Sequence, residues 1–112
     1  MTLFEKIAAR EIPARIVCET EDYLAFHDVN PQAPVHVLIV PKRVIPRLAD
    51  AQAGDADLLG RMLLAVREIA EAAGVAESGY RVVINNGRDA GESVPHLHIH
   101  LLGGRALQWP PG

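Results

Sequence analysis

The segment His96–Leu102, with the sequence HLHIHLL, constrains the fold of this chain more than any other feature, because polar and apolar residues alternate along it. Side chains of a β-strand point alternately to the two faces of its sheet, so one face receives only imidazoles and the other only aliphatic groups. The imidazoles that share a face are His96, His98 and His100. The aliphatic residues between them, which are the expected partners of a packed helix, are Leu97, Ile99 and Leu101.

Two helices are predicted elsewhere in the chain. The first is expected over residues 2–10, because Thr2 and Glu5 have the spacing of a capping box. The second is expected over residues 55–73, where apolar residues recur on one stripe and Gly74 supplies the stop. The stripe consists of Leu58, Leu59, Met62, Val66, Ile69, Ala70 and Ala73.

Four further strands are predicted at residues 14–19, 23–28, 35–41 and 80–86. Together with the histidine segment they give five strands and two helices, which is an α+β domain. Helix 55–73 is expected to cover one face of the sheet, and the other face is then free for chemistry.

The composition narrows the classes of partner. A chain of 112 residues forms one domain, residues 1–112. Its 11 Lys and Arg against 14 Asp and Glu give a net charge of −3, which argues against a nucleic-acid-binding protein. The apolar runs are too short to cross a membrane, and the first ten residues lack the apolar stretch of a secretory signal. Cys18 is the only cysteine, so we expect a cytoplasmic protein without a disulfide or a cysteine-bound zinc ion.

The three histidines admit three interpretations. They are structural if every ring is hydrogen-bonded in the core. They are metal ligands if two of them join a third group such as His36, although no cysteine and no carboxylate within two residues of the segment supports such a site. They form a nucleophilic site if one neutral imidazole attacks phosphorus while a loop such as Gly91–Ser93 holds the phosphate.

Longer matches favour the nucleophilic site. HLHIHLL resembles the motif His-Φ-His-Φ-His-Φ-Φ, with Φ apolar, after which the histidine triad (HIT) family is named. The stretches FHDVNPQAPVHVLIVPK, GYRVVIN, GES and LLGGRALQWPPG resemble the Hint branch of that family, the purine nucleoside phosphoramidases. The matches run from Phe4 to Gly112, so the resemblance covers nearly the whole chain.

The resemblance implies a fold, an activity and an assembly. The fold is a five-stranded antiparallel sheet with two helices, and strand 80–86 joins two such sheets across the two-fold axis of a homodimer, with helix 55–73 and the outward-facing Leu64 beside the axis. The activity is hydrolysis of the P–N bond of adenosine or guanosine 5′-phosphoramidates and related aminoacyl adenylates. AMP or GMP is released through a covalent nucleotidyl-histidine intermediate, without a cofactor or a metal ion.

The resemblance also implies roles for individual residues. His98 matches the nucleophile, and the other catalytic residues are His36, His96, His100 and Ser93. Asp28 matches the carboxylate that holds the ribose hydroxyls, and the alternative is a turn-forming residue before Asn30–Pro31. The full set of implied nucleotide-binding residues is Phe4, Ile7, Phe26, His27, Asp28, Val29, Asn85, Gly91, Glu92, Ser93, His98 and His100.

The single tryptophan, Trp109, is implied to line the active site of the partner subunit, and the simpler alternative is that it covers the core of its own subunit. The chain departs from the branch at three positions: histidine is common in place of Arg43, glutamine in place of Glu92, and an aromatic residue in place of Pro95. These departures affect the rim of the pocket and the preference among leaving groups.

Two other functions remain open at this stage. One is a dinucleoside polyphosphate hydrolase of the Fhit-like branch, which has a glutamine in the loop before the histidines and lacks the WPPG ending. The other is a nucleotide-binding or interaction protein in which catalysis is incidental.

Overall fold

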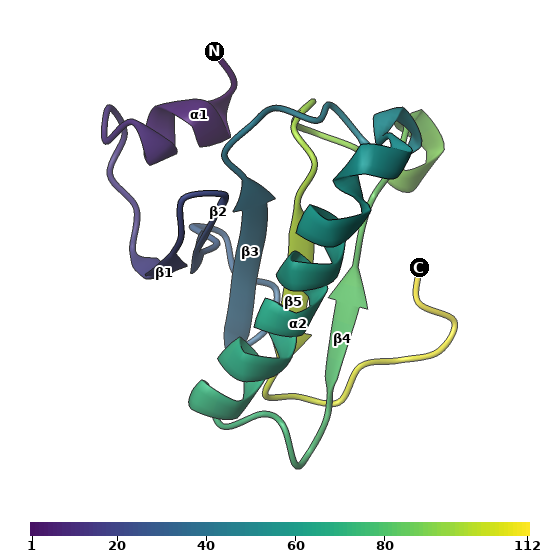
Figure 1. Cartoon of the computed structure of the whole chain (residues 1–112). Coiled ribbons are helices and arrows are strands. Elements are labelled where there is room, and N and C mark those ends of the chain that lie inside the picture. Colours follow the sequence, from purple (N-terminus) through teal and green to yellow (C-terminus); the bar gives the residue numbers. More distant parts are fainter.

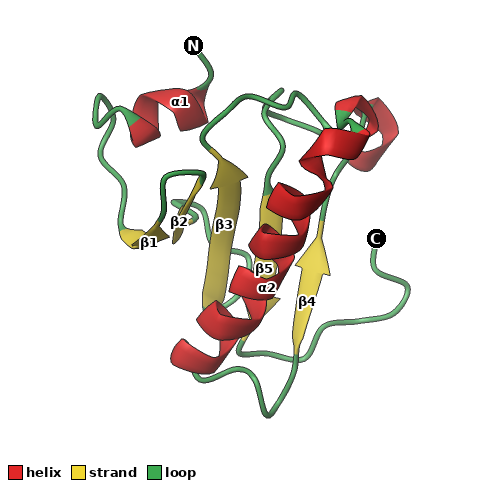
Figure 2. Ribbon diagram, viewed as in Figure 1, coloured by secondary structure: helices red, strands yellow, loops and turns green.

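The computed structural model describes residues 1–112 and consists of a five-stranded antiparallel sheet with two helices (Figures 1 and 2). The strands are β1 (Ile16–Glu19), β2 (Tyr23–His27), β3 (Val35–Pro41), β4 (Tyr80–Val83) and β5 (Ile99–Gly103). They lie in the order β1-β2-β3-β5-β4, which places the histidine strand between β3 and β4. The helices are α1 (Leu3–Ala8) and α2 (Ala56–Ala72). The predicted α+β class, the antiparallel sheet and the two helices are therefore confirmed.

Helix α1 begins at the predicted cap but ends earlier than predicted. The Thr2 hydroxyl accepts the Glu5 N–H at 3.1 Å, and the Glu5 carboxylate accepts the Thr2 N–H at 2.8 Å, so the capping box is present. The predicted extension to residue 10 is wrong, because Arg10 has a φ of 64° and leaves the helical conformation.

Helix α2 covers one face of the sheet, and in Figure 1 it lies in front of β5, with β3 and β4 on either side. Its buried residues pack on aliphatic side chains of β3 and β5, including Ile99 and Leu101 as predicted. The helical pattern predicts Ala73 on the buried stripe, and this prediction is wrong. Ala73 is exposed, because α2 ends at Ala72 and Gly74 follows with a φ of 78°. The cluster on this face consists of Ala25, Val37, Ile39, Met62, Val66, Ile69, Ala70, Val75, Ile99 and Leu101.

The opposite face holds a second, smaller cluster and the histidines. There α1 packs two of its side chains on β2 and β3, and the cluster consists of Phe4, Ile7, Leu24, Phe26, Leu38 and Val40. This face is thus partly covered rather than open. Neither α1 nor α2 has the length and apolar composition that a membrane-spanning helix requires.

Three strand boundaries differ from the prediction by two residues or more. β1 begins at Ile16, β4 ends at Val83 opposite His100, and β5 begins at Ile99 and continues to Gly103. The first three residues of the histidine segment are outside the ladder because the Leu97 N–H donates to the Ile45 carbonyl at 2.7 Å. The Ile45 carbonyl, in the loop after β3, thus accepts the N–H that a longer β5 would use within the sheet.

Candidate active site

A cavity of about 280 Å³ lies between α1 and the histidine-bearing face of the sheet. Its wall is mostly apolar, with one carboxylate, one hydroxyl and two imidazoles. The lining residues are Leu3, Phe4, Ile7, Ile12, Pro13, Ala14, Phe26, Asp28, Val29, Leu38, Ser93, Val94, His98 and His100. Such a cavity, apolar with a few convergent polar groups, is typical of a small-molecule site.

Eight of the predicted nucleotide-binding residues line this cavity, and four do not: His27, Asn85, Gly91 and Glu92. The cavity is also lined by residues that the sequence did not indicate. Leu38 could have been found, because it alternates with His36 on β3 and must share its face. The segment Ile12–Ala14 follows α1 without regular structure, and its sequence carries no signal for the site.

His98 lines the cavity just before β5. Its Nδ1 lies 2.8 Å from the backbone oxygen of His96. A carbonyl oxygen can only accept, so Nδ1 carries a proton and donates it. In the neutral ring Nε2 is then unprotonated, and no protein group hydrogen-bonds it. An imidazole held this way offers its lone pair as a nucleophile.

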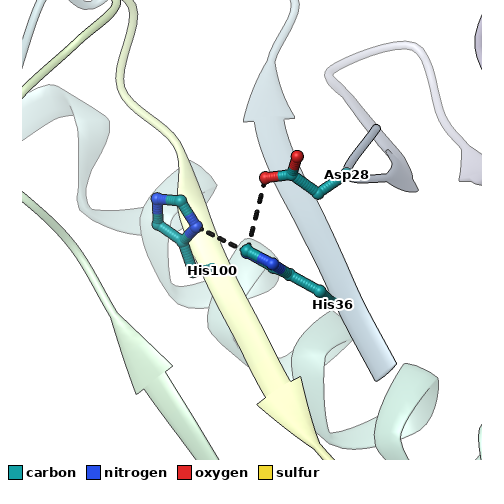
Figure 3. Close-up of side chains that lie close together, drawn as sticks. All are labelled: Asp28, His36 and His100. Carbon is teal, nitrogen blue, oxygen red and sulfur yellow. Dashed lines mark hydrogen bonds and ion pairs between the residues drawn. The ribbon is translucent and has the colours of Figure 1, made fainter. Parts of the chain in front are cut away.

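The rings of His36 and His100 lie next to each other (Figure 3), and the His100 ring also lies beside that of His98, with ring centres 4.9 Å apart. The His36 Nδ1 accepts the Gln32 N–H at 3.0 Å, so its proton lies on Nε2, which donates to the His100 Nδ1 at 2.9 Å. His100 is therefore protonated on Nε2. That nitrogen is buried and has no hydrogen-bond partner in the protein. A buried donor without a partner costs about 1–3 kcal/mol, which an oxygen of a bound ligand would recover.

His96 lies deepest of the three, with 1% of its surface exposed. Its Nε2 donates to the Pro41 carbonyl at 2.6 Å, and its Nδ1 lies 2.7 Å from the Thr2 hydroxyl. The edge of the Phe4 ring contacts both His96 and His98, with ring centres 5.5 and 5.0 Å apart. His96 thus holds the segment from behind and does not reach the cavity.

Asp28 forms the turn contact considered for it, and it also lines the cavity. One carboxylate oxygen accepts the Asn30 N–H at 2.9 Å, which is the turn-forming contact. The other lies 3.4 Å from the His36 Nε2, and the residue lines the cavity (Figure 3). The carboxylate is therefore held rigidly at the cavity with its second oxygen available.

The donor atoms of Asp28, His36 and His100 lie within 4.8 Å of one another, which is close enough to hold a metal ion. The two ring nitrogens are 2.9 Å apart and share a proton. Two nitrogens on one tetrahedral zinc ion, each at about 2.0–2.1 Å, would be about 3.3 Å apart. The geometry therefore matches a hydrogen bond better than a metal site.

The departures at Arg43 and Glu92 are explained by ion pairs. Arg43 pairs with the buried Asp55 at the start of α2. Glu92 accepts from the Arg47 guanidinium at 3.0 Å and from the Gly87 N–H at 3.1 Å, and the bond from Arg47 lowers the pKa of this carboxyl. The Glu92 side chain thus fixes the loop before Ser93. Nothing in the structure explains the proline at position 95.

Burial disfavours the charged form of His36, His96 and His100, and this predicts how stability depends on pH. Burial, with the neighbouring His98 and His36, lowers the pKa of His100 to about 4, and burial also lowers the pKa of His36 and His96. Between about pH 6.5 and 4 the unfolded chain therefore binds more protons than the folded one, so stability falls as the pH is lowered through this range.

The His100 contribution amounts to about 2 kcal/mol between pH 7 and 5. Urea unfolding at the two pH values measures it, and His100→Gln is expected to lose less stability on acidification than the wild type. An equal loss in the two proteins would show that His100 is not the acid-sensitive group.

An antiparallel sheet with a helix on one face and clustered histidines on the other defines the class of histidine triad folds. The family model described as the HIT domain matches residues 9–107. The chain belongs to the HIT family.

Relatives and solved structures agree with this assignment. An uncharacterised HIT-like protein of Synechococcus elongatus is 58% identical over 111 residues, which cover 99% of this chain and 96% of that protein. The crystal structure of a HIT family hydrolase from Legionella pneumophila is 47% identical, with a TM-score of 0.98 and full coverage of both chains. A histidine triad nucleotide-binding protein from Candida albicans is 33% identical, with a TM-score of 0.84, and the match covers 98% of this chain and 83% of that one. The fold is that of the HIT family hydrolases.

Proposed function

We propose that this protein is a cytoplasmic, homodimeric purine nucleoside phosphoramidase. Its substrates are adenosine or guanosine 5′-phosphoramidates and related aminoacyl adenylates, and its nucleotide product is AMP or GMP. The observation that carries the proposal is the His98 ring, whose Nδ1–H is held by the His96 carbonyl while Nε2 keeps its lone pair beside the cavity. The Legionella protein, named as a hydrolase, and the Candida protein, named as nucleotide-binding, support it.

In the first step the His98 Nε2 bonds to the α-phosphorus as the P–N bond breaks. The electron pair of that bond leaves with the amine, which takes a proton that the Ser93 hydroxyl relays from the solvent. The His100 Nε2–H, the one buried donor without a partner, stabilises the charge that develops on a phosphate oxygen. The Ser93 hydroxyl lines the same part of the wall and assists the leaving group.

In the second step water attacks the phosphorus of the nucleotidyl-His98 intermediate and the P–Nε2 bond breaks. One proton of the water is released and the mononucleotide leaves. His98 returns to its starting tautomer because its Nδ1 remains bonded to the His96 carbonyl throughout. No metal ion takes part in either step.

The apolar part of the cavity suits a purine base. Phe4, Ile7, Phe26 and Leu38 provide aromatic and aliphatic surfaces, and Asp28 provides a carboxylate that can accept from the ribose hydroxyls. Hydrogen bonds from a diol to one carboxylate fix the sugar, and this fixes the distance from the base to the phosphate.

A turnover assay tests the proposal. The protein is incubated with an adenosine 5′-phosphoramidate, with diadenosine tetraphosphate and with AMP alone, each with and without an exhaustive excess of chelator. Hydrolysis of the phosphoramidate that survives chelation is the expected result. Faster hydrolysis of the dinucleotide would favour the Fhit-like activity, and binding of AMP without turnover would favour a binding protein. Loss of activity on chelation would restore the metal-ion hypothesis.

Several exposed apolar residues support the homodimer. β4 is an edge strand, and its Val82 is 39% exposed although it pairs with the buried Leu101. On α2, Leu64 is 54% exposed. A second copy that pairs along β4 would cover both and would satisfy the free backbone groups of the edge.

We expect sedimentation of a dimer at micromolar concentration, and of a monomer when Val82→Lys places a charge at the edge. A wild-type monomer under the same conditions would contradict the assembly.

The tail fits the same assembly. Trp109 is 81% exposed, so it does not cover the core of its own subunit, and this alternative is wrong. The tail runs outward past β4 (Figure 1), held by a bond of 2.9 Å from Arg81 to the Gln108 carbonyl. A tail that leaves at the proposed dimer edge can reach the active site of the partner, where Trp109 would contact the leaving group.

A further inference from the structure

One contact of the histidine segment is not used by the proposed chemistry: the hydroxyl of Thr2, 94 positions away in the chain, lies 2.7 Å from the His96 Nδ1. The direction of this hydrogen bond is determined. The His96 Nε2 faces the Pro41 carbonyl at 2.6 Å and must carry the proton, so in the neutral ring Nδ1 is the acceptor and Thr2 the donor. Burial lowers the pKa of His96, in agreement with a neutral ring.

The same hydroxyl also accepts the Glu5 N–H at 3.1 Å as the cap of α1. Thr2 therefore uses one hydroxyl in two directions, as an acceptor for the helix and as a donor to the histidine. A second residue of the same helix also contacts the histidines: the Phe4 ring packs in an edge-type geometry against both His96 and His98.

The hydrogen bond from Thr2 to His96 affects the nucleophile, His98, through the backbone of His96. The carbonyl of His96 accepts the Nδ1–H of His98 and so decides which His98 nitrogen has the free lone pair. A ring that is fixed at both nitrogens, buried and packed against Phe4 fixes the backbone that carries it. Without the Thr2 hydroxyl, the Nδ1 of His96 would be a buried acceptor with no partner.

We propose that Thr2 is a positioning residue for the reaction: its hydroxyl, by donating to the His96 Nδ1, holds the His96 carbonyl where it fixes the reactive tautomer of His98. The claim about turnover rests on the proposed function, whereas the claim about the His96 and His98 tautomers is independent of it.

Four variants separate this role from simple capping of α1. Thr2→Ser keeps both functions of the hydroxyl, and Thr2→Val removes both. Thr2→Asp keeps a good cap, since a carboxylate accepts the Glu5 N–H, but it cannot donate to His96. Thr20→Val is the matched control, because the Thr20 hydroxyl accepts the N–H groups of Asp22 and Tyr23 at 3.1 Å in a turn that has no contact with the histidines.

Two measurements are made on each variant. The first is kcat and KM for an adenosine 5′-phosphoramidate as a function of pH, with urea unfolding for stability. The second is the nitrogen NMR spectrum of the imidazoles, which distinguishes protonated from unprotonated ring nitrogens. In Thr2→Asp the Nδ1 of His96 faces a carboxylate, so this ring is expected to take a second proton at a higher pH than the wild-type ring, whose pKa is lowered by burial.

We expect Thr2→Ser and Thr20→Val to keep the kcat of the wild type. Thr2→Val is expected to lose roughly tenfold in kcat, the factor that corresponds to one lost buried hydrogen bond, and Thr2→Asp a similar factor at pH values above the titration of His96, where no proton lies between the His96 Nδ1 and the carboxylate. KM should change little in Thr2→Asp, and its stability should equal that of the wild type.

Equal kcat and an equal pH profile in Thr2→Asp and the wild type would overturn the proposal and leave Thr2 as a helix cap only. If the wild type shows no turnover but its spectrum shows Nδ1–H on His98 and Nε2–H on His96, the proposed function fails and the positioning of His98 by Thr2 is tested by the spectra of the variants alone. Wild-type tautomers in both Thr2→Val and Thr2→Asp would then refute it.

Discussion

His98→Ala is expected to lower the turnover of an adenosine 5′-phosphoramidate by at least about 10³-fold, because one atom supplies the whole covalent step. Among the imidazoles that line the cavity, the His98 Nε2 is the one unprotonated nitrogen without a hydrogen bond, since the His100 Nδ1 accepts from His36 and the His100 Nε2 carries the proton. No neighbouring ring can therefore take over the attack.

The control for this variant is its affinity for AMP. The base and ribose sites do not include His98, so AMP should still bind, and unfolding should remain cooperative. A covalent nucleotidyl adduct trapped on another residue, or turnover near that of the wild type, would contradict the assignment.

Leu101→Ala is expected to lower the free energy of unfolding by about 2–5 kcal/mol, the usual cost of removing a fully buried leucine from a core. Leu101 has 0% of its surface exposed and lies in the cluster beneath α2, between Val37 and Val82 on the neighbouring strands. Urea unfolding at one protein concentration measures the change, because assembly would contribute to stability.

Leu48→Ala is the matched control, since Leu48 is exposed and its loss should cost no more than about 0.5 kcal/mol. Where Leu101→Ala is still folded it should keep its kcat, because its side chain lies on the face away from the histidines. Equal costs at the two positions would show that the α2 face is not the main core.

His98 and Leu101 belong to one segment, yet the first variant is expected to lose turnover and the second to lose stability. The alternation in HLHIHLL explains this difference, and for the same reason the sequence alone predicted the two faces of the sheet. The period of two is a local property of the chain, and Ile99 and Leu101 face α2 as it requires. The capping box at Thr2 is equally local, and its two hydrogen bonds are present.

The features that the sequence did not predict depend on contacts between distant segments. The histidine segment enters the ladder only at Ile99, because Leu97 finds the Ile45 carbonyl, and no local pattern contains that partner. The bond between Thr2 and His96 joins residues at opposite ends of the chain. The ion pair of Arg47 and Glu92, which fixes the loop before Ser93, is of the same kind.

The site residues also combine features that the sequence predicted with features that depend on contacts between distant segments. The family resemblance implies that three of the site residues are Asp28, His36 and His100. They lie close together because β2, β3 and β5 are neighbours in the sheet. The tautomers of His36 and His100 follow from Gln32, whose N–H points at His36 only after the loop between β2 and β3 has folded. The resemblance thus predicted residues that lie together in the fold, whereas the positions of their protons needed the structure.

The hydrogen bonds of Gln32, His36 and His100 all run in one direction, and this has an electrostatic consequence. The Gln32 N–H donates to His36, His36 donates to His100, and His100, which lines the cavity, carries a buried N–H without a protein partner. Each bond polarises the next, so the last proton is more positive than that of an isolated imidazole. The cavity thereby gains an anion-attracting pole made of neutral groups, which avoids the desolvation cost of a buried cation and retains its strength at any pH well above the His100 pKa of about 4.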